Sequence, residues 1–362
     1  MRNLLLIFST VGILLFTTFC QNSEQEQIRD MVDSTGFATS EIQMDSINSR
    51  IDRLQGHLLD SLEAENKIRP WKTVICPHDD YSYVGYLYPA ALRDIRTNTI
   101  ILIGVAHKAS KYNLQDKIVF GAFDYWQSPY GKAEVTPLRE KILEHLPENT
   151  YTVHENMQSI EHSLEPIIPF LQENNPSLKI LPVLVPYMSF DDLQIHAEAF
   201  SNALQHAAEG KKLKWGKDYT IVISSDAVHY GDEDWGGKNF ARYGSDSAGY
   251  QKAMKHEKDI INTYLTGNLT KEKIRGFYHS TVKKENYKEY KWTWCGRYSI
   301  PFGLLLSEDL AKAQELNSVS GHLIDYSTSI SDKPLPVKDI GMGHTAPAQI
   351  RHWVGYAAVG YE

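Results

Sequence analysis

The hydrophobic positions of this chain fall into short apolar runs separated by longer amphipathic stretches. Four runs are typical of buried strands, because each is a nearly continuous series of apolar residues between polar boundaries: residues 72–76, 99–104, 179–185 and 219–224. Pro182 interrupts the third run, and since proline has no N–H to donate, we expect that strand at an edge or a bulge. Residues 320–328 and 350–358 are candidates for further strands.

Between these runs, apolar residues recur at the three- and four-residue spacing of amphipathic helices. The stretches with this spacing are residues 40–66, 86–95, 136–146, 163–173, 190–208, 244–265 and 298–316. Strands that alternate with helices predict an α/β fold, with a mainly parallel central sheet flanked by helices. No repeat or linker interrupts the pattern after residue 66, so it predicts a single domain over residues 67–362.

The N-terminal residues follow a different pattern. Arg2 gives a short positive start, and residues 4–19 form a mostly apolar run that is shorter than the roughly 20 residues of a membrane-spanning helix. This length suits the apolar region of a signal peptide, and Cys20 directly after it resembles the lipidated first residue of a bacterial lipoprotein. Phe19 departs from that pattern, because signal peptidases usually need a small residue there, and an uncleaved N-terminal anchor is the alternative.

Both alternatives place the body of the protein outside the cytoplasm and attach it to a membrane, which for a lipoprotein is the bacterial cell envelope. The expected organisation is a lipoprotein-type signal peptide over residues 1–20, then a polar tether and helical approach segment over 21–66, then the domain.

Composition excludes several classes of protein. A chain of 362 residues with 42% hydrophobic and 23% charged residues is ordinary for a globular protein, which excludes disordered, collagen-like and multi-span membrane proteins. The net charge of −8 argues against a nucleic-acid partner, because phosphate binding depends on clustered Lys and Arg. If Cys20 is lipidated, Cys76 and Cys295 remain, and an oxidising compartment would allow them to form a disulfide.

Polar side chains follow three of the predicted strands at the point where each strand ends. His78 follows the first strand, His107 follows the second, and Asp226 and His229 follow the fourth. Ligands of open parallel sheets bind outside the carboxyl ends of the strands. We therefore expect these side chains to converge on one crevice, although satisfied loop histidines are the alternative.

Five separated motifs extend over roughly residues 70–360. They are Pro77-His78 with Tyr81 and Gly85; Gly104 with His107; Glu161-His162-Ser163-Leu164-Glu165 continuing to Pro169-Phe170; Ser224-Ser225-Asp226 with His229 and Gly231; and Cys295-Gly296-Arg297. Together these motifs resemble the Memo family, whose bacterial and archaeal members are called AmmeMemoRadiSam system protein B, and they occur in the family's order.

The resemblance implies a fold similar to the class III extradiol ring-cleaving dioxygenases of the LigB type, which are non-haem iron enzymes. It also implies that His78, His107 and Cys295 are the ligands of one metal ion, with Asp226 and His229 beside them. Two imidazoles and a thiolate leave coordination positions open, and the thiolate makes copper or zinc alternatives to iron.

Other residues of these motifs suggest supporting roles. His229 could shuttle a proton while Asp226 orients it, although capping of the following segment is the alternative. Ser163 is a candidate helix N-cap, and a helix N-terminus aimed at the pocket would favour an anionic ligand. Glu161 and His162 precede this residue, and we expect His162 to be a further site residue.

The chain departs from the family pattern at two places. Asp79 and Asp80 follow His78 where small residues are usual, and Lys108 stands where a second histidine is common. The two carboxylates could join the metal shell or bind a harder cation, and Lys108 could pair with them or with substrate; a surface salt bridge is the alternative. Pocket positions implied by the motifs include Tyr81 and Arg297, and Trp292 and Trp294 are either a stacking wall or core aromatics.

Two classes of function therefore remain open. One is a metal-dependent redox enzyme, dioxygenase-like, acting on a small aromatic or otherwise oxidisable molecule. The other is a non-catalytic module that binds a peptide or small ligand on the same scaffold. The family name also implies an AMMECR-type partner and a radical-SAM partner, but export would separate this chain from a cytoplasmic radical-SAM protein.

Overall fold

The computed structural model describes residues 26–207, 213–316 and 318–362. The predicted signal peptide and the lipidation site at Cys20 lie outside these described residues. Within the described ranges, no helix combines the length and the apolar character that crossing a membrane requires.

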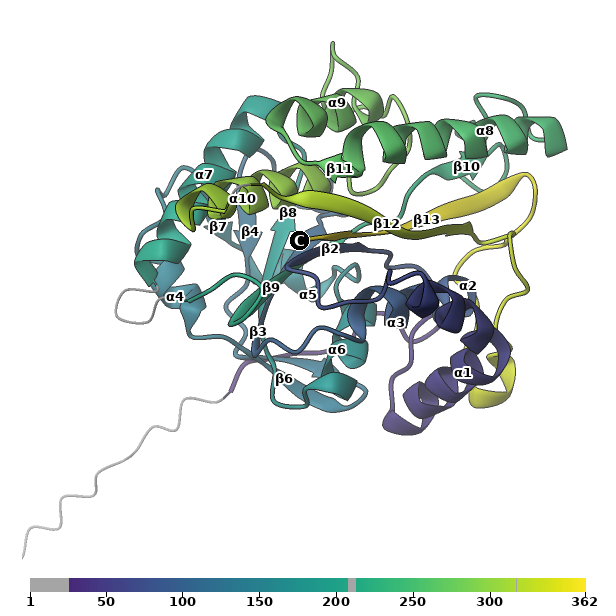
Figure 1. Cartoon of the computed structure of the whole chain (residues 1–362), viewed down its shortest axis with the longest axis horizontal. Helices are drawn as coiled ribbons and strands as arrows, with labels where there is room; N and C mark the ends of the chain where they lie inside the picture. Colours follow the sequence, from purple (N-terminus) through teal and green to yellow (C-terminus); the bar gives the residue numbers. More distant parts are fainter. Residues whose placement is uncertain (1–25, 208–212, 317) are drawn as a thin grey trace, which may run out of the picture.

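A sheet of 13 strands forms the centre of the molecule (Figure 1). Its main path runs β1 (Ile28–Arg29), β5 (Tyr125–Ser128), β6 (Gly131–Val135), β8 (Lys179–Val185), β3 (Thr99–Val105), β9 (Tyr219–Ser224), β2 (Thr73–Cys76), β13 (His352–Tyr361), β12 (Ser320–Thr328) and β11 (Gly267–Asn268). Off this path, β10 (His229–Gly231) pairs with β13, and β4 (Ile118–Phe120) pairs with β7 (Tyr151–Val153) and β8.

The centre of the sheet is parallel, as the sequence predicts. Strands β6, β8, β3, β9 and β2 run parallel to one another, and antiparallel pairs β5–β6 and β2–β13–β12–β11 flank them. The four predicted buried strands are β2, β3, β8 and β9. The two further candidates are β12 and β13, of which β13 extends to Tyr361.

Pro182 lies in β8, which is an interior strand, so the expectation of a sheet-edge strand is wrong. On one side β8 pairs along its whole length with β3. On the other side, β6 pairs with Lys179 and Ile180 and β4 pairs with Leu184. Neither pairing includes Pro182, so the missing proline N–H breaks no ladder hydrogen bond on that side.

The helices agree with the amphipathic stretches but are mostly shorter. They are α1 (Glu41–Ala64), α2 (Tyr81–Val84), α3 (Leu87–Leu92), α4 (Leu138–Leu143), α5 (Glu155–Ser159), α6 (Ile168–Asn174), α7 (Phe190–Ala207), α8 (Ser247–Ile260), α9 (Lys271–Thr281) and α10 (Ser299–Ala313). A π-helical turn (Ile261–Leu265) extends α8, and 3₁₀ turns cover Ala109–Tyr112, Glu165–Ile167 and Lys338–Ile340. The pattern did not predict α9, α5 or the short strands β4 to β7, because segments this short carry little periodicity.

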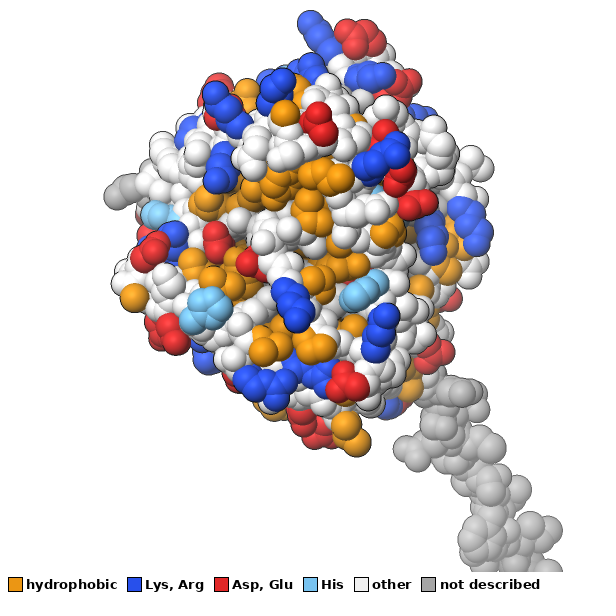
Figure 2. Space-filling view, turned by 90° about the vertical axis from the view of Figure 1, so that its right-hand side faces the viewer, with side chains coloured by type: hydrophobic (Ala, Val, Ile, Leu, Met, Phe, Trp, Pro, Cys, Tyr) orange, Lys and Arg blue, Asp and Glu red, His pale blue; other side chains and the backbone are white. Residues whose placement is uncertain are grey.

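Two hydrophobic cores lie on opposite faces of the sheet, which gives three layers. Helices α7, α8, α9 and α10 cover one face, and α1, α2, α3 and α6 lie along the other (Figure 1). Helix α1, predicted above as an approach segment, contributes buried Met44, Ile47, Ile51 and Leu59 to the second core. Charged side chains of both signs are interspersed over the face shown in Figure 2.

The segment before α1 is joined to the domain by a buried ion pair. Arg29 Nη1 lies 2.6 Å from Glu165 Oε1, and neither side chain is appreciably exposed to solvent. The guanidinium also donates to the backbone carbonyls of Gln158 and Glu161 and lies 4.0 Å from the centre of the Trp126 ring. A buried carboxylate left without its cation is costly, so this pair fixes the segment to the sheet.

We predict that Arg29→Ala lowers the free energy of unfolding by about 3 kcal/mol or more, because it leaves Glu165 buried and unpaired. Equilibrium unfolding in urea measures this change. The matched control is Lys132→Ala, which removes a solvent-exposed ion pair with Glu26 and should have a much smaller effect. Equal losses in the two variants would contradict the role assigned to Arg29.

Candidate metal centre and pocket

The carboxyl ends of three adjacent strands bring the predicted site residues together. In the sheet β9 lies between β3 and β2, so the loops after these strands start side by side. His78 follows β2, His107 follows β3 and Asp226 follows β9, and the two imidazole rings lie 5.2 Å apart between centres. The side chains that follow these three strands therefore lie close together, as predicted.

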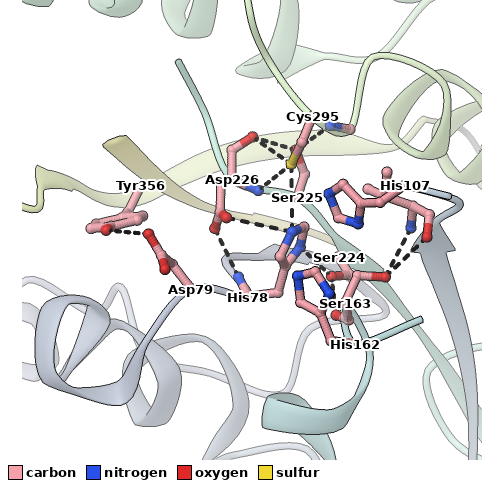
Figure 3. Close-up of polar contacts among 12 residues, drawn as sticks. His78, Asp79, His107, His162, Ser163, Ser224, Ser225, Asp226, Cys295 and Tyr356 are labelled. Carbon is pink, nitrogen blue, oxygen red and sulfur yellow. Dashed lines mark hydrogen bonds and ion pairs between the residues drawn. The ribbon is translucent and has the colours of Figure 1, made fainter. Parts of the chain in front are cut away.

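A chain of hydrogen bonds fixes the tautomer of His78 (Figure 3). Ser224 Oγ donates its proton to the carbonyl of Ser163 at 2.5 Å. The same oxygen lies 2.7 Å from His78 Nδ1, so Nδ1 carries the proton and donates to it. His78 Nε2 is then left with its lone pair. Burial, reinforced by the neighbouring histidines, holds the pKa of His78 well below its ordinary value, so the ring is neutral.

Glu161 fixes His107 in the corresponding way. One carboxylate oxygen accepts from His107 Nδ1 at 2.8 Å and the other accepts from the His107 amide at 2.8 Å. Burial acts to raise the pKa of Glu161, but the charge and hydrogen bond of His107, with help from His162 and the Ser163 amide, lower it to about 2. The carboxylate therefore accepts a hydrogen bond from His107 Nδ1–H, and the neutral form of this ring has its lone pair on Nε2.

Cys295 reaches the same place from the loop before α10. Its Sγ lies 3.6 Å from His78 Nε2 and accepts from the Asp226 amide at 3.0 Å. Gly296 permits this approach, because a Cβ at that position would lie 2.2 Å from Ser225 Oγ. Burial, with the charge of Asp226, raises the pKa of the thiol well above its ordinary value.

One donor atom from each of His78, His107 and Cys295 lies within 4.8 Å of the other two. This separation allows three ligands to share one ion, and the donor types suit iron, copper or zinc. Asp226 and His229 form a second such group with Cys295, and Glu161 and His162 form a third with His107. The residues present therefore fit the metal that the resemblance implies.

A cavity of about 220 Å³ opens beside His78 and His107, whereas Cys295 lies behind its lining residues. Its walls carry imidazoles, carboxylates and a few apolar side chains: Asp33, Phe37, His78, Asp79, Asp80, His107, His162, Asp226, His229, Trp235, Thr345, Ala346 and Val354. His162 stacks on His107 with ring centres 4.9 Å apart, which agrees with its expected place in the site.

Asp226 and His229 line the cavity, but they are not hydrogen-bonded to each other within the described ranges. Asp226 Oδ1 accepts from the His78 amide at 2.9 Å, so the carboxylate orients His78 instead of His229. His229 Nε2 is buried and has no hydrogen-bond partner among the described residues. Burial, with nearby histidines, lowers the pKa of His229 to about 3, so the ring is neutral.

Ser163 does not cap a helix, so that prediction is wrong. Its hydroxyl donates to the Val105 carbonyl and accepts from the Val105 amide, because the end of β3 lies beside it. The segment that follows starts as a 3₁₀ turn at Glu165. The cavity walls are acidic, which also removes the reason to expect an anionic ligand.

The departures from the family pattern have different outcomes. Asp79 accepts from the Tyr356 hydroxyl at 2.7 Å, and Asp80 accepts from the amide and hydroxyl of Thr345. Lys108 is exposed and forms no ion pair with either carboxylate in the described part of the chain.

Tyr81 and Arg297 lie outside the cavity wall. Tyr81 is a core residue whose hydroxyl donates to the Pro166 carbonyl. Arg297 stacks on the ring of Tyr290 at 3.5 Å and on that of Tyr298 at 4.7 Å. Both residues belong to the family motifs, but neither of them lines the cavity.

The alternative of a Cys76–Cys295 disulfide does not occur. Both cysteines are free and buried. Cys76 packs in the core on the α1 side of the sheet, whereas Cys295 lies at the ends of the strands. Cys295 is therefore free to bind a metal.

Glu257 is a structural centre that the sequence did not reveal. Its fully buried carboxylate accepts four hydrogen bonds, from the indole N–H groups of Trp292 and Trp294, the Val228 amide and the Tyr326 hydroxyl. Val228 directly precedes His229, and Trp292 and Trp294 precede Cys295 in its loop, whereas Tyr326 lies in β12. In the sequence, Glu257 is one of several charges on the amphipathic helix α8, so nothing marked it. The two tryptophans are core aromatics rather than a stacking wall.

Comparison with known proteins shows which family the chain resembles over most of its length. Residues 46–337 match the family described as Memo-like protein. A MEMO1 family protein from Metallosphaera sedula is 29% identical over 164 residues, which is 44% of this chain and 54% of the relative. A MEMO1 family protein from Methanothermobacter thermautotrophicus is 26% identical over 181 residues, 48% of this chain and 60% of the relative. The chain thus spans little more than half the length of these two relatives.

A longer alignment exists with Protein MEMO1 of Xenopus laevis. It is 24% identical over 300 residues, which is 80% of this chain and 89% of that protein. The proposed ligands His78, His107 and Cys295 lie inside the matched range of the family, whereas Asp33, Phe37 and Thr345 lie outside it.

We predict that Glu257→Gln lowers the free energy of unfolding by about 2 kcal/mol, because an amide nitrogen would face donors that need an acceptor. It should also weaken metal binding, since the loops of His229 and Cys295 lose their common anchor. Urea unfolding and metal titration measure the two effects. The milder control is Tyr326→Phe, which removes one donor and leaves the carboxylate with three. A Glu257→Gln protein with unchanged metal affinity would show that this carboxylate does not support the site.

Proposed function

The chain belongs to the Memo-like protein family, and we propose that it binds one metal ion through His78, His107 and Cys295 and uses it for dioxygenase-like redox chemistry on a small molecule. Iron is the proposed metal, with copper or zinc as alternatives. The observation that carries the proposal is the convergence of two imidazole nitrogens and a thiol within 4.8 Å at a small cavity.

The hydrogen bonds of His78 and His107 orient both rings for metal binding in the absence of an ion. Both imidazoles have Nδ1 hydrogen-bonded to an oxygen, which leaves each Nε2 for ligation. The thiol must lose its proton, and a cation at the same place compensates the charge that burial otherwise disfavours. A bound iron ion would supply a redox-active Lewis acid with open coordination positions.

Other residues handle protons and orientation. His229 lines the cavity with a neutral ring, and its Nε2 has no hydrogen-bond partner within the described ranges, which makes it the candidate for exchanging a proton with a ligand hydroxyl. Asp226 holds the His78 backbone and lies 3.4 Å from His78 Nε2 through its second oxygen. These contacts support a role in proton transfer for His229 and a positioning role for Asp226.

The size of the cavity favours a small molecule over a peptide. An apolar cavity of about 150 Å³ holds a benzene ring, and this one measures about 220 Å³. A non-catalytic module that binds a small ligand shares the same pocket. Oxygen consumption by the metal-loaded protein in the presence of a ligand separates the enzyme from the module.

We predict that wild-type protein purified without added metal contains close to one metal ion per chain. Cys295→Ser should lose most of it, because the thiolate is one of three ligands. Cys76→Ser is the matched control, since it alters a buried thiol in the core and should retain the metal. Elemental analysis of the purified variants measures this. Equal metal content in Cys295→Ser and wild type would contradict the proposed ligand set.

We also propose that the protein is exported and anchored through lipid on Cys20, which would separate it from cytoplasmic radical-SAM partners. The support is the short apolar run that ends at Cys20 and the polar residues after it. Labelled palmitate should be incorporated by wild type and not by Cys20→Ser. Label in both proteins, or in neither, would overturn the lipoprotein proposal.

A further inference from the structure

Part of the cavity wall comes from segments outside the range that matches the family. Asp33 and Phe37 precede α1, and Thr345 and Ala346 precede β13, whereas the match covers residues 46–337. These two flanking segments lie over the ends of the strands. They give the pocket features that the family motifs do not specify.

Both segments are held in place by hydrogen bonds. The Glu165 carboxylate accepts from the amides of Val32 and Asp33, and the Gly343 amide donates to the Thr35 carbonyl. Gly36 runs so close to the site that a Cβ there would lie 1.9 Å from Asp80 Oδ1. These contacts, together with the buried Arg29–Glu165 ion pair, fix the two segments of the cavity wall in place.

Asp33 presents an unused acceptor at this wall. Its Oδ1 accepts from the amides of Thr35 and Gly36, which fixes the carboxylate. Its Oδ2 has no hydrogen-bond partner in the part of the chain that the structure describes. The Phe37 ring lines the same cavity, with its centre 6.4 Å from that of His162.

The charge on the cavity wall has one sign. Four carboxylates line it, those of Asp33, Asp79, Asp80 and Asp226, and neither lysine nor arginine is among its lining residues in the described ranges. Burial raises the pKa of Asp79, Asp80 and Asp226 to about 7, so at pH 7 each of these three side chains carries only part of a negative charge. Together with the carboxylate of Asp33, this remaining charge disfavours an anionic ligand and attracts a cationic one.

We propose that the wall formed by Asp33 and Phe37 selects a small organic cation, a molecule of about one ring that carries an amine, and rejects ligands that carry a carboxylate. The inference rests on the proposed function in that it concerns the same pocket. Asp33 receives the ammonium group, and the Phe37 face packs against the adjoining carbon atoms.

The test compares three ring compounds that differ in charge: 3,4-dihydroxybenzylamine, 4-methylcatechol and 3,4-dihydroxybenzoate. Calorimetric titration at pH 7 without oxygen measures their affinities for metal-loaded and metal-free protein. We expect the amine to bind about tenfold more tightly than the carboxylate, the neutral compound lying between them. Asp33→Asn should remove most of this preference. Asp30→Asn is the matched control, because it removes the same charge from an exposed position outside the cavity.

Each outcome is decisive. The inference is overturned if the carboxylate binds as tightly as the amine, if Asp33→Asn and Asp30→Asn have equal effects, or if no probe binds in either state. If Asp33→Asn does not fold, the order of the three affinities in the wild-type protein still tests the inference. A preference that persists in protein unable to bind metal would support this inference while the proposed function fails. Metal binding without the preference would leave the proposed function standing alone.

Discussion

The hydrogen bonds that hold the two imidazole rings are the constraint on which the site depends. Ser224 Oγ donates a hydrogen bond to the Ser163 carbonyl and accepts one from His78 Nδ1. Glu161 accepts a hydrogen bond from His107 Nδ1. Each ring therefore presents Nε2 to the same small volume. These oxygens belong to strand ends and to the segment after Ser159, so the fold itself sets the protonation of the ligands. A metal that binds there meets imidazole rings that are already oriented, so its binding costs little free energy of reorganisation.

The sheet and two buried carboxylates hold these residues in their relative positions. The parallel centre of the sheet places the ends of β2, β9 and β3 beside one another. The buried Glu257 carboxylate joins the segments of His229 and Cys295, because it accepts hydrogen bonds from Val228, Trp292 and Trp294. The Arg29–Glu165 pair attaches the N-terminal segment whose Asp33 and Phe37 complete the cavity. The ligands lie in the family match, and the wall beyond it is the part open to specialisation.

Some of this was accessible from the sequence because it follows from strong local patterns. Continuous apolar runs identified β2, β3, β8 and β9, and the rule for parallel sheets then placed His78, His107 and Asp226 together. Contacts between distant segments were not accessible. Ser163 had the appearance of a helix cap but bonds to β3, and Glu257 looked like one more charge on α8. Asp33 lay in a polar tether, where nothing indicated that Glu165 would hold it against the site.

The central claim is that the protein fixes both imidazoles with the proton on Nδ1 before any metal binds. Nitrogen-15 NMR of histidine-labelled, metal-free protein measures this directly, because the two ring nitrogens have different shifts when protonated and unprotonated. His78 and His107, assigned through His78→Asn and His107→Asn, should both show a protonated Nδ1 and an unprotonated Nε2, and Ser224→Ala should release the first of them. A neutral ring of either histidine with its proton on Nε2 instead of Nδ1 in the wild-type protein would contradict the claim.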